Sequence, residues 1–250
     1  MNRRISFKSF GEFALRWLLV PLILIGAGTG FAVYIITHTT DFIVKDFLTY
    51  DRLIAAGLEH IKLVLVSSFL AIAFSLPMGI IISRPRFKRL EKWVVGITNV
   101  GQTVPSIAIL GLFMGFFGLG FKTAIFALWL YALLPILRNT LAGIRSVNPG
   151  IIQAAHGMGM HPMRILFKIE LPLALKVIMG GIRTAVVINV GTAALATFIG
   201  AGGFGDLIVT GLKLSRMEIL LTGAVSTALL AILADYLLSH VEAKLISYGD

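Results

Sequence analysis

Residues 148–172, NPGIIQAAHGMGMHPMRILFKIELP, form the one long segment of moderate polarity between stretches that are apolar enough to span a bilayer. We predict that this segment begins with a short helix. Asn148 is suited to cap it, and Pro149 fits its first position, where a missing N–H costs nothing. Gly159 is suited to end it, because glycine adopts the left-handed conformation that closes many helices.

A second short helix is predicted after this glycine. His161 and Pro162 are expected to start it, and the apolar residues up to Ile169 to continue it. Leu171-Pro172 is expected to interrupt it, because proline lacks an N–H and its ring collides with the preceding helical turn.

The same segment resembles the "EAA" loop of permease subunits of ATP-binding-cassette importers, whose pattern is E-A-A-x-x-x-G-x(9)-I-x-L-P. The matching positions are Gln153, Ala154, Ala155, Gly159, Ile169, Leu171 and Pro172. The one departure is Gln153, which stands where the family has glutamate and lacks the charge for a salt bridge. The resemblance implies that this loop docks on a separate ATPase and couples ATP hydrolysis to transport.

The composition predicts an all-α integral membrane protein. Of its 250 residues, 57% are hydrophobic and only 14% are charged, and the mean hydropathy is +0.92, far above that of soluble domains. The formal net charge is +10, but the basic residues lie in a few segments between apolar stretches. That distribution is typical of cytoplasmic loops, so no nucleic-acid partner is expected. The chain has no cysteine, which excludes disulfides and thiolate chemistry.

We predict about six membrane-spanning helices within a single domain, residues 1–250. They cover approximately residues 13–37, 59–82, 92–117 and 123–137, the uncharged stretch between Arg183 and Asp206, and residues 219–239. Residues 38–58 are predicted to form an interfacial helix on the outer surface. The basic segments 1–12, 83–92 and 138–172 then fall on the same side of the membrane. Both termini and the loop at 148–172 are therefore expected in the cytoplasm of a bacterium, with the protein in its inner membrane.

Two polar features of the spans leave alternatives open. Residues 102–106, QTVPS, lie inside the third span, where polar groups and a proline are tolerated only beside a cavity or neighbouring helices. They either line a path or kink a packed helix. The basic residues at 84–92 either only fix the topology or also bind anionic membrane lipid.

Several patterns suggest catalysis or cofactors, but their context is unfavourable. Gly200, Gly202 and Gly205 match G-x-G-x-x-G, yet they follow a membrane helix rather than a soluble strand, so we expect a bend at the outer end of the fifth span and no cofactor. The chain lacks the phosphate-binding P-loop motif, so we expect no ATP hydrolysis and no catalytic residue in it. No metal site is expected, because the five-residue spacing of His156 and His161 does not suit one helical face. Asp235 is either a proton-relay group or part of an interfacial or intersubunit ion pair.

The resemblance extends over roughly residues 58–240. The stretch from Ala154 to Ile208, together with residues 102–106 and YALLPILRN at 131–139, resembles the osmoprotectant branch of these permeases, which imports glycine betaine, choline and carnitine. It implies a type I importer permease fold, with residues 58–240 as the permease core. It also implies a second permease subunit, identical or different, two ATPase subunits and an extracytoplasmic substrate-binding protein. The methionine-importer branch shares the glycine-rich end, so an amino-acid substrate stays an alternative.

The substrate path is predicted from polar residues in apolar surroundings. These are Gln102, Thr103, Ser106, Asn189 and Thr192. Quaternary ammonium groups are usually captured by aromatic cages, and no cluster of Trp and Tyr is visible in the spans, so we assign capture to the binding protein. An ion-gradient-driven transporter is a rival hypothesis, for which only Asp235 offers a buried ionisable group. A scaffold protein would leave the loop pattern unexplained.

Overall fold

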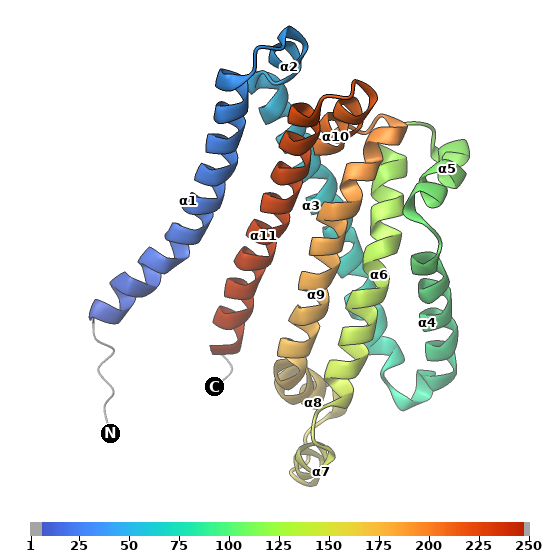
Figure 1. Ribbon diagram of the computed structural model, residues 1–250. Helices are drawn as coiled ribbons and strands as arrows, with labels where there is room; N and C mark the ends of the chain where they lie inside the picture. The colour runs from blue at the N-terminus through green and yellow to red at the C-terminus, as the bar shows by residue number, and fades with distance from the viewer. Residues whose placement is uncertain (1–6, 248–250) are drawn as a thin grey trace.

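The computed structural model describes residues 7–247, with side chains described from residue 19 to residue 246. Residues 1–6 of the predicted N-terminal segment 1–12 therefore lie outside the described residues, and residues 7–12 already belong to the first helix. Within them the chain is helical and contains no strand, as predicted (Figure 1). The elements are α1 (Phe7–His38), α2 (Phe42–Phe47), α3 (Tyr50–Ile82), η1 (Pro85–Phe87), α4 (Lys88–Thr103), α5 (Ser106–Phe117), α6 (Phe121–Arg145), α7 (Pro149–Gly157), α8 (Pro162–Ile165), the π-helical turn η2 (Leu166–Glu170), α9 (Leu171–Ala193), η3 (Ala194–Ile199), α10 (Phe204–Lys213) and α11 (Met217–Ser247).

Six candidate spans confirm the predicted number. Five are long apolar helical stretches, and the sixth is the pair formed by η1–α4 and α5, which is bent by 102°. The third span is therefore not one continuous helix. Val104 has an extended backbone, with φ −71° and ψ 131°, because the residue before a proline is disfavoured in the helical region. Pro105 then starts α5 in a new direction.

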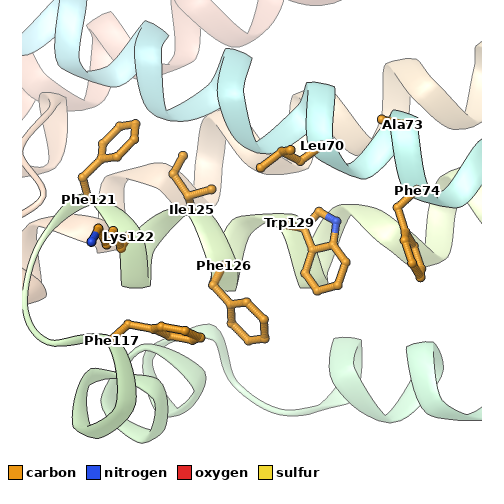
Figure 2. Close-up of a pocket in the computed structure, with 9 residues that line it drawn as sticks. All are labelled: Leu70, Ala73, Phe74, Phe117, Phe121, Lys122, Ile125, Phe126 and Trp129. Atoms are coloured by element: carbon orange, nitrogen blue, oxygen red, sulfur yellow. The ribbon is translucent and has the colours of Figure 1, made fainter.

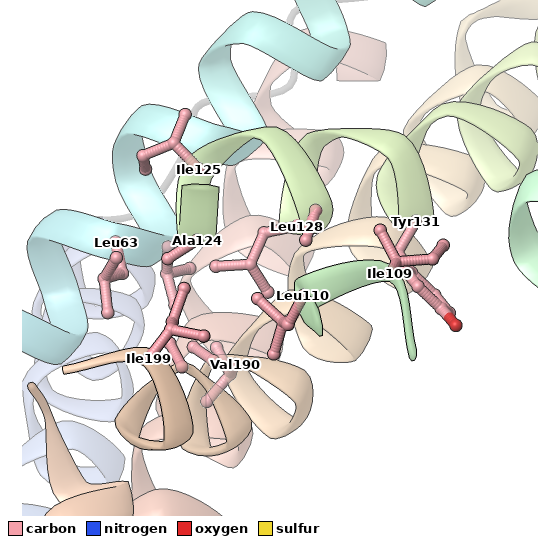
Figure 3. Close-up of a cluster of buried hydrophobic side chains, with 13 residues drawn as sticks. Leu63, Ile109, Leu110, Ala124, Ile125, Leu128, Tyr131, Val190 and Ile199 are labelled. Atoms are coloured by element: carbon pink, nitrogen blue, oxygen red, sulfur yellow. The ribbon is translucent and has the colours of Figure 1, made fainter. Parts of the chain in front are cut away.

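Helix α6 is the centre of the bundle. It packs against α9 and α3 over most of its length and against α4 and α5 on its remaining side. Figure 3 shows the largest buried cluster, in which Leu63 of α3, Leu128 of α6 and Val190 of α9 meet around the start of α5. The polar surface of these helices is small, so van der Waals packing and close backbone approach hold the bundle together in lipid.

Helix α1 stands at one edge of the bundle and contacts chiefly α11. Much of its apolar surface is exposed, for example Leu22 at 64% and Ile23 at 60%. The first residues of α1 and the last residues of α11 lie at the same end of the bundle as α7 (Figure 1). We call this the loop end, and the opposite end, with α2, α5 and α10, the far end.

The segment 38–58 differs from the single interfacial helix that we predicted. Only the short α2 is separate, and α3 already begins at Tyr50. Asp41 caps α2, since its side chain accepts a hydrogen bond of 2.8 Å from the Ile43 N–H, and it also forms an ion pair of 2.7 Å with Arg216.

Leu171-Pro172 does not interrupt the second loop helix. The chain stays helical from Pro162 to Ile199, with η2 inserted just before α9. A π-helical turn widens the backbone, which gives room for the ring of Pro172 and removes the need for its missing N–H. The predicted break is therefore replaced by a local change of helix type.

Candidate functional site

The loop at 148–172 protrudes from the loop end, and α7 is its outermost element (Figure 1). Its predicted caps are confirmed. The Asn148 side chain accepts a hydrogen bond of 2.8 Å from the Gly150 N–H, and the His161 Nδ1 accepts one of 3.3 Å from the Met163 N–H. Gly159 has φ +76°, and the Met160 N–H closes the turn on the Ala155 carbonyl at 3.1 Å. The left-handed glycine thus fixes the direction between α7 and α8.

The tip of the loop presents small and apolar residues to the outside. Gln153, Ala154 and Gly159 are exposed, whereas Ala155 is buried within the loop. Large apolar side chains that are also exposed there are Ile151, Met158, Met163 and Phe167. Apolar side chains on a protruding loop are characteristic of a surface that contacts another protein. Ala155 packs inward, so it supports the loop rather than such a contact.

The other three motif residues lie at the base of the loop. Ile169 is in η2, and Leu171 and Pro172 form the start of α9. Ile169 and Leu171 are half-buried, and Pro172 is exposed. These residues therefore shape the stem of the loop, while Gln153, Ala154 and Gly159 lie on its tip.

Two ion pairs at the loop end were missed by the sequence analysis. Arg84, which follows α3, pairs with Glu170, and Arg145, the last residue of α6, pairs with Glu91 of α4. The sequence contained a signal for them. Glu91 and Glu170 are the only acidic residues between Glu59 and Asp206, and each stands in a basic segment, where an acid is expected to find a cation.

The polar stretch 102–106 coincides with the break between α4 and α5. The Gln102 amide donates a hydrogen bond of 3.2 Å to the Tyr131 carbonyl of α6, and the Tyr131 hydroxyl donates one to the Val104 carbonyl. Thr103 is exposed. Ser106 and Thr192 line the same cavity of about 10 Å³ between α5, α6 and α9. Four of the five predicted path residues thus lie at or beside the break, and the stretch both kinks the helix and leaves polar groups at its surface.

Asn189 lies elsewhere. It is fully buried, and its amide donates hydrogen bonds of 3.0 Å to both Ser67 and Ser68 on α3. In this structure it joins α9 to α3, and no surface that a solute could reach includes it.

The prediction for Asp235 has to be corrected. The sequence predicts that it is either a proton-relay group or part of an interfacial or intersubunit ion pair. Instead Arg183 of α9 donates to Asp235 of α11 at 2.8 Å and to Glu242 at 3.1 Å. The pairing is within the chain, because α9 and α11 pack side by side. The Arg183 guanidinium donates to both carboxylate oxygens of Asp235. These oxygens would have to accept a proton in a relay, and the charge-assisted hydrogen bonds stabilise them in the ionised form, which disfavours a relay role.

The glycine-rich segment forms the predicted bend at the far end. Gly200, Gly202 and Gly203 have φ of +69°, +79° and +95°. The bend is held to α3: the Gly203 N–H donates to the Glu59 carboxylate at 3.0 Å, and the Phe204 N–H donates to His60 Nδ1 at 3.2 Å. No group of three His, Cys, Asp or Glu residues suited to a metal occurs within the described part of the chain.

The sequence analysis also missed an aromatic groove. Figure 2 shows Phe74 of α3, Phe117 of α5, and Phe126 and Trp129 of α6 along a depression of about 680 Å³. The rings form a row, with Phe126 and Trp129 5.4 Å apart between centroids. Lys122 lies in the same groove. A cation in the lining disfavours binding of an ammonium group, so the groove is not suited to a quaternary ammonium cage.

Comparison with known proteins gives a consistent result. Residues 75–247 match the profile of a family described as "Binding-protein-dependent transport system inner membrane component". The carnitine transport permease protein OpuCD of Listeria monocytogenes is 48% identical over 176 residues, which cover 70% of this chain and 78% of the relative. The choline transport system permease protein OpuBB of Bacillus subtilis is 44% identical over 76% of this chain and 87% of the relative. The osmoprotectant import permease protein OsmY of Salmonella typhimurium is 46% identical over 77% of this chain and 82% of the relative.

Solved structures share the fold. A chain of the MetNI methionine ABC transporter in an inward-facing conformation superposes with a TM-score of 0.69, covering 78% of this chain and 96% of that chain at 24% identity. A chain of a bacterial alginate ABC transporter gives a TM-score of 0.63 over 98% and 99% of the two chains at 17% identity. At these identities the likeness concerns the fold, which is that of type I ABC importer permeases.

Proposed function

This chain belongs to the family of binding-protein-dependent transport system inner membrane components, and on that premise we propose that it forms the membrane path for a quaternary ammonium osmoprotectant such as glycine betaine, choline or carnitine. It is a multi-pass inner membrane permease and a transport subunit. The substrate class is supported by the names of its relatives, which are carnitine, choline and osmoprotectant permeases. Its sequence identity to them, 44–48%, is about twice its identity to the methionine transporter chain, 24%.

The protruding loop is the observation that carries the coupling part of the proposal. ATP is hydrolysed on separate ATPase subunits, and Gln153, Ala154 and Gly159 contact them. Their exposure on a tip with unpartnered apolar side chains supports this role. The remaining motif residues do not contact the ATPases but hold the tip of the loop in position. They are Ala155, Ile169, Leu171 and Pro172. When the ATPases close, they displace the loop and with it the ends of α6 and α9.

The substrate passes the break between α4 and α5. Gln102, Thr103, Ser106 and Thr192 supply weak polar contacts there, and no tight site is needed, because an extracytoplasmic binding protein captures the solute. The angle between α4 and α5 changes at little cost, because only Val104 and Pro105 lie between the two helices. The path is completed by a second permease subunit, a copy of this chain or a related one.

The loop end faces the cytoplasm in this proposal, together with both termini. Four exposed cations beside α4 support that orientation: Arg86, Lys88, Arg89 and Lys92. With the exposed Trp93 they line a depression of about 910 Å³, and they contact anionic headgroups of the inner leaflet.

The experiment is ATP-dependent uptake into proteoliposomes that contain the permease, its ATPase and its binding protein. We expect uptake of labelled choline, carnitine or glycine betaine, and none of methionine. Uptake of methionine alone would favour the amino-acid alternative. Uptake driven by an imposed ion gradient without ATP would overturn the importer assignment.

Gly159 offers a matched pair of variants. A Cβ at this position meets no atom of this chain within 4 Å, and asparagine and aspartate tolerate φ +76° better than other side chains. Gly159→Asp is therefore expected to insert and fold but to lose most uptake, because a carboxylate is buried at the ATPase contact. Gly159→Asn has the same size without the charge and should retain much more. Equal, normal uptake by both variants would remove Gly159 from the contact.

A further inference from the structure

Two ion pairs connect the loop to the segment 84–91, which comprises the turn after α3, η1 and the start of α4. The loop and its stems contribute Arg145 and Glu170, and the other segment contributes Arg84 and Glu91. Each segment thus supplies one cation and one acid. Because no other acid lies between Glu59 and Asp206, neither arginine has an alternative acidic partner in that part of the sequence.

The Arg84–Glu170 pair is the more buried one. Arg84 Nη1 donates to one carboxylate oxygen of Glu170 at 3.1 Å, and Nη2 donates to the other. The remaining Nε donates to the Ser83 hydroxyl at 3.2 Å. Glu170 is only 6% exposed. A two-pronged contact to a buried carboxylate has a fixed geometry, so a displacement of Glu170 is transmitted to Arg84 rather than absorbed by side-chain rotation.

The Arg145–Glu91 pair holds the other stem. Arg145 ends α6, directly before the turn into α7, and its Nη2 donates to a carboxylate oxygen of Glu91. Glu91 lies in the first turn of α4. A further polar contact follows along the same two helices, where Arg138 donates to Asn99 Oδ1 at 3.1 Å. One stem of the loop is therefore attached to the first turn of α4, and the other to Arg84, which directly precedes η1 and α4.

We propose that these two pairs transmit the movement of the loop to α4 and so to the break at Thr103–Ser106. The inference rests on the proposed function, in which the ATPases displace the loop. Helix α4 is one continuous helix whose first turn is attached to Arg145 through Glu91 and whose last residue is Thr103. A displacement of both stems moves its start as a unit and changes the angle at the break, where the substrate passes. Arg84, Glu91, Arg145 and Glu170 are thus positioning residues for transport and do not contact the substrate.

The test compares uptake with ATP hydrolysis in proteoliposomes that contain the complete transporter. Glu91→Gln and Glu170→Gln are expected to keep the ATPase bound and hydrolysing. The amount of solute moved per ATP should fall by roughly fivefold or more, the lower end of typical coupling between sites. Lys176→Gln is the control, because it removes one exposed cation from α9, six positions after Glu170, that forms no ion pair with any described residue.

Charge reversal separates transmission from simple stability. Arg145 is exposed, so the double variant Arg145→Glu with Glu91→Arg restores the pair without burying a lone charge. It should recover most of the solute moved per ATP, whereas each single reversal should not. A ratio unchanged in Glu91→Gln and Glu170→Gln would overturn the inference. So would loss of the ATPase from both variants without rescue by the double reversal, because the pairs would then serve assembly. A wild type without ATP-dependent uptake would instead refute the proposed function.

Discussion

Replacement of Gly181 by alanine is predicted to separate α6 from α9. These two helices make the largest contact in the bundle, and they carry the two stems of the loop. A methyl group at 181 would lie 2.4 Å from Asn139 Cβ and 2.8 Å from the Pro135 carbonyl oxygen. Carbon atoms pack at about 3.5–4.0 Å, so the helices must move apart locally by roughly 1 Å. The rigid backbone of Pro135 leaves little room for another adjustment.

The expected loss of stability is obtained by comparing Gly181→Ala with Gly180→Ala, a substitution at the neighbouring position of the same helix. Overpacking of this kind costs about 1–3 kcal/mol. A methyl at Gly180 or Gly191 meets nothing within 4 Å, and alanine there should gain about 0.5–1 kcal/mol of helix stability over glycine. Gly181→Ala gains the same helix propensity, so we expect it to be less stable than Gly180→Ala by the overpacking cost alone, about 1–3 kcal/mol.

The assay is titration of the purified protein in mixed micelles with a denaturing detergent, followed by the fluorescence of Trp129 on α6. Trp17 and Trp93, the other two tryptophans, are replaced by phenylalanine in every sample. Gly191→Ala is the second control. If Gly181→Ala were as stable as the two control variants, close approach of the α6 and α9 backbones could not be what stabilises the bundle.

Two further predictions concern polar residues in the spans. Asp235→Asn should lower thermal stability, because Arg183 keeps only Glu242 as a full charge partner. A protonophore should leave ATP-driven uptake by this variant unchanged at constant ATP. A change in uptake would revive the relay hypothesis. Gln102→Leu should raise the KM for uptake with little loss of stability. Asn189→Leu should instead lower stability by about 1–3 kcal/mol, the net contribution of its two hydrogen bonds to Ser67 and Ser68, with KM unchanged. The opposite pattern in these two variants would return Asn189 to the path.

Local features of the fold could be predicted from the sequence. The caps at Asn148 and His161 and the left-handed turn at Gly159 each depend on backbone geometry within a few residues. The spans depend on the transfer of about 20 successive side chains into lipid. The bend at Gly200–Gly203 follows from the same reasoning, since a row of positive φ angles needs glycine.

The predictions for Pro105 and Pro172 were only partly right, because the effect of a proline depends on its surroundings as well as on its own backbone preference. Pro105 stands at a break in its span, whereas the chain around Pro172 stays helical. At the α4–α5 break, the Gln102 amide and the Val104 carbonyl find hydrogen-bond partners on Tyr131 of α6. At Pro172 the chain instead forms a π-helical turn directly before α9, in whose first turn the proline lies.

The sequence by itself predicted about six membrane spans and the places where the loop at 148–172 turns, because hydropathy and backbone preference are properties of short stretches. The tertiary structure decided which charges meet: Arg84 with Glu170 across 86 positions, and Arg183 with Asp235 across 52. It also decided that Asn189 is buried against α3 while Ser106 and Thr192 share one cavity. Such partners depend on which helices pack and at what rotation, and this is settled by the fit of side chains over the whole bundle.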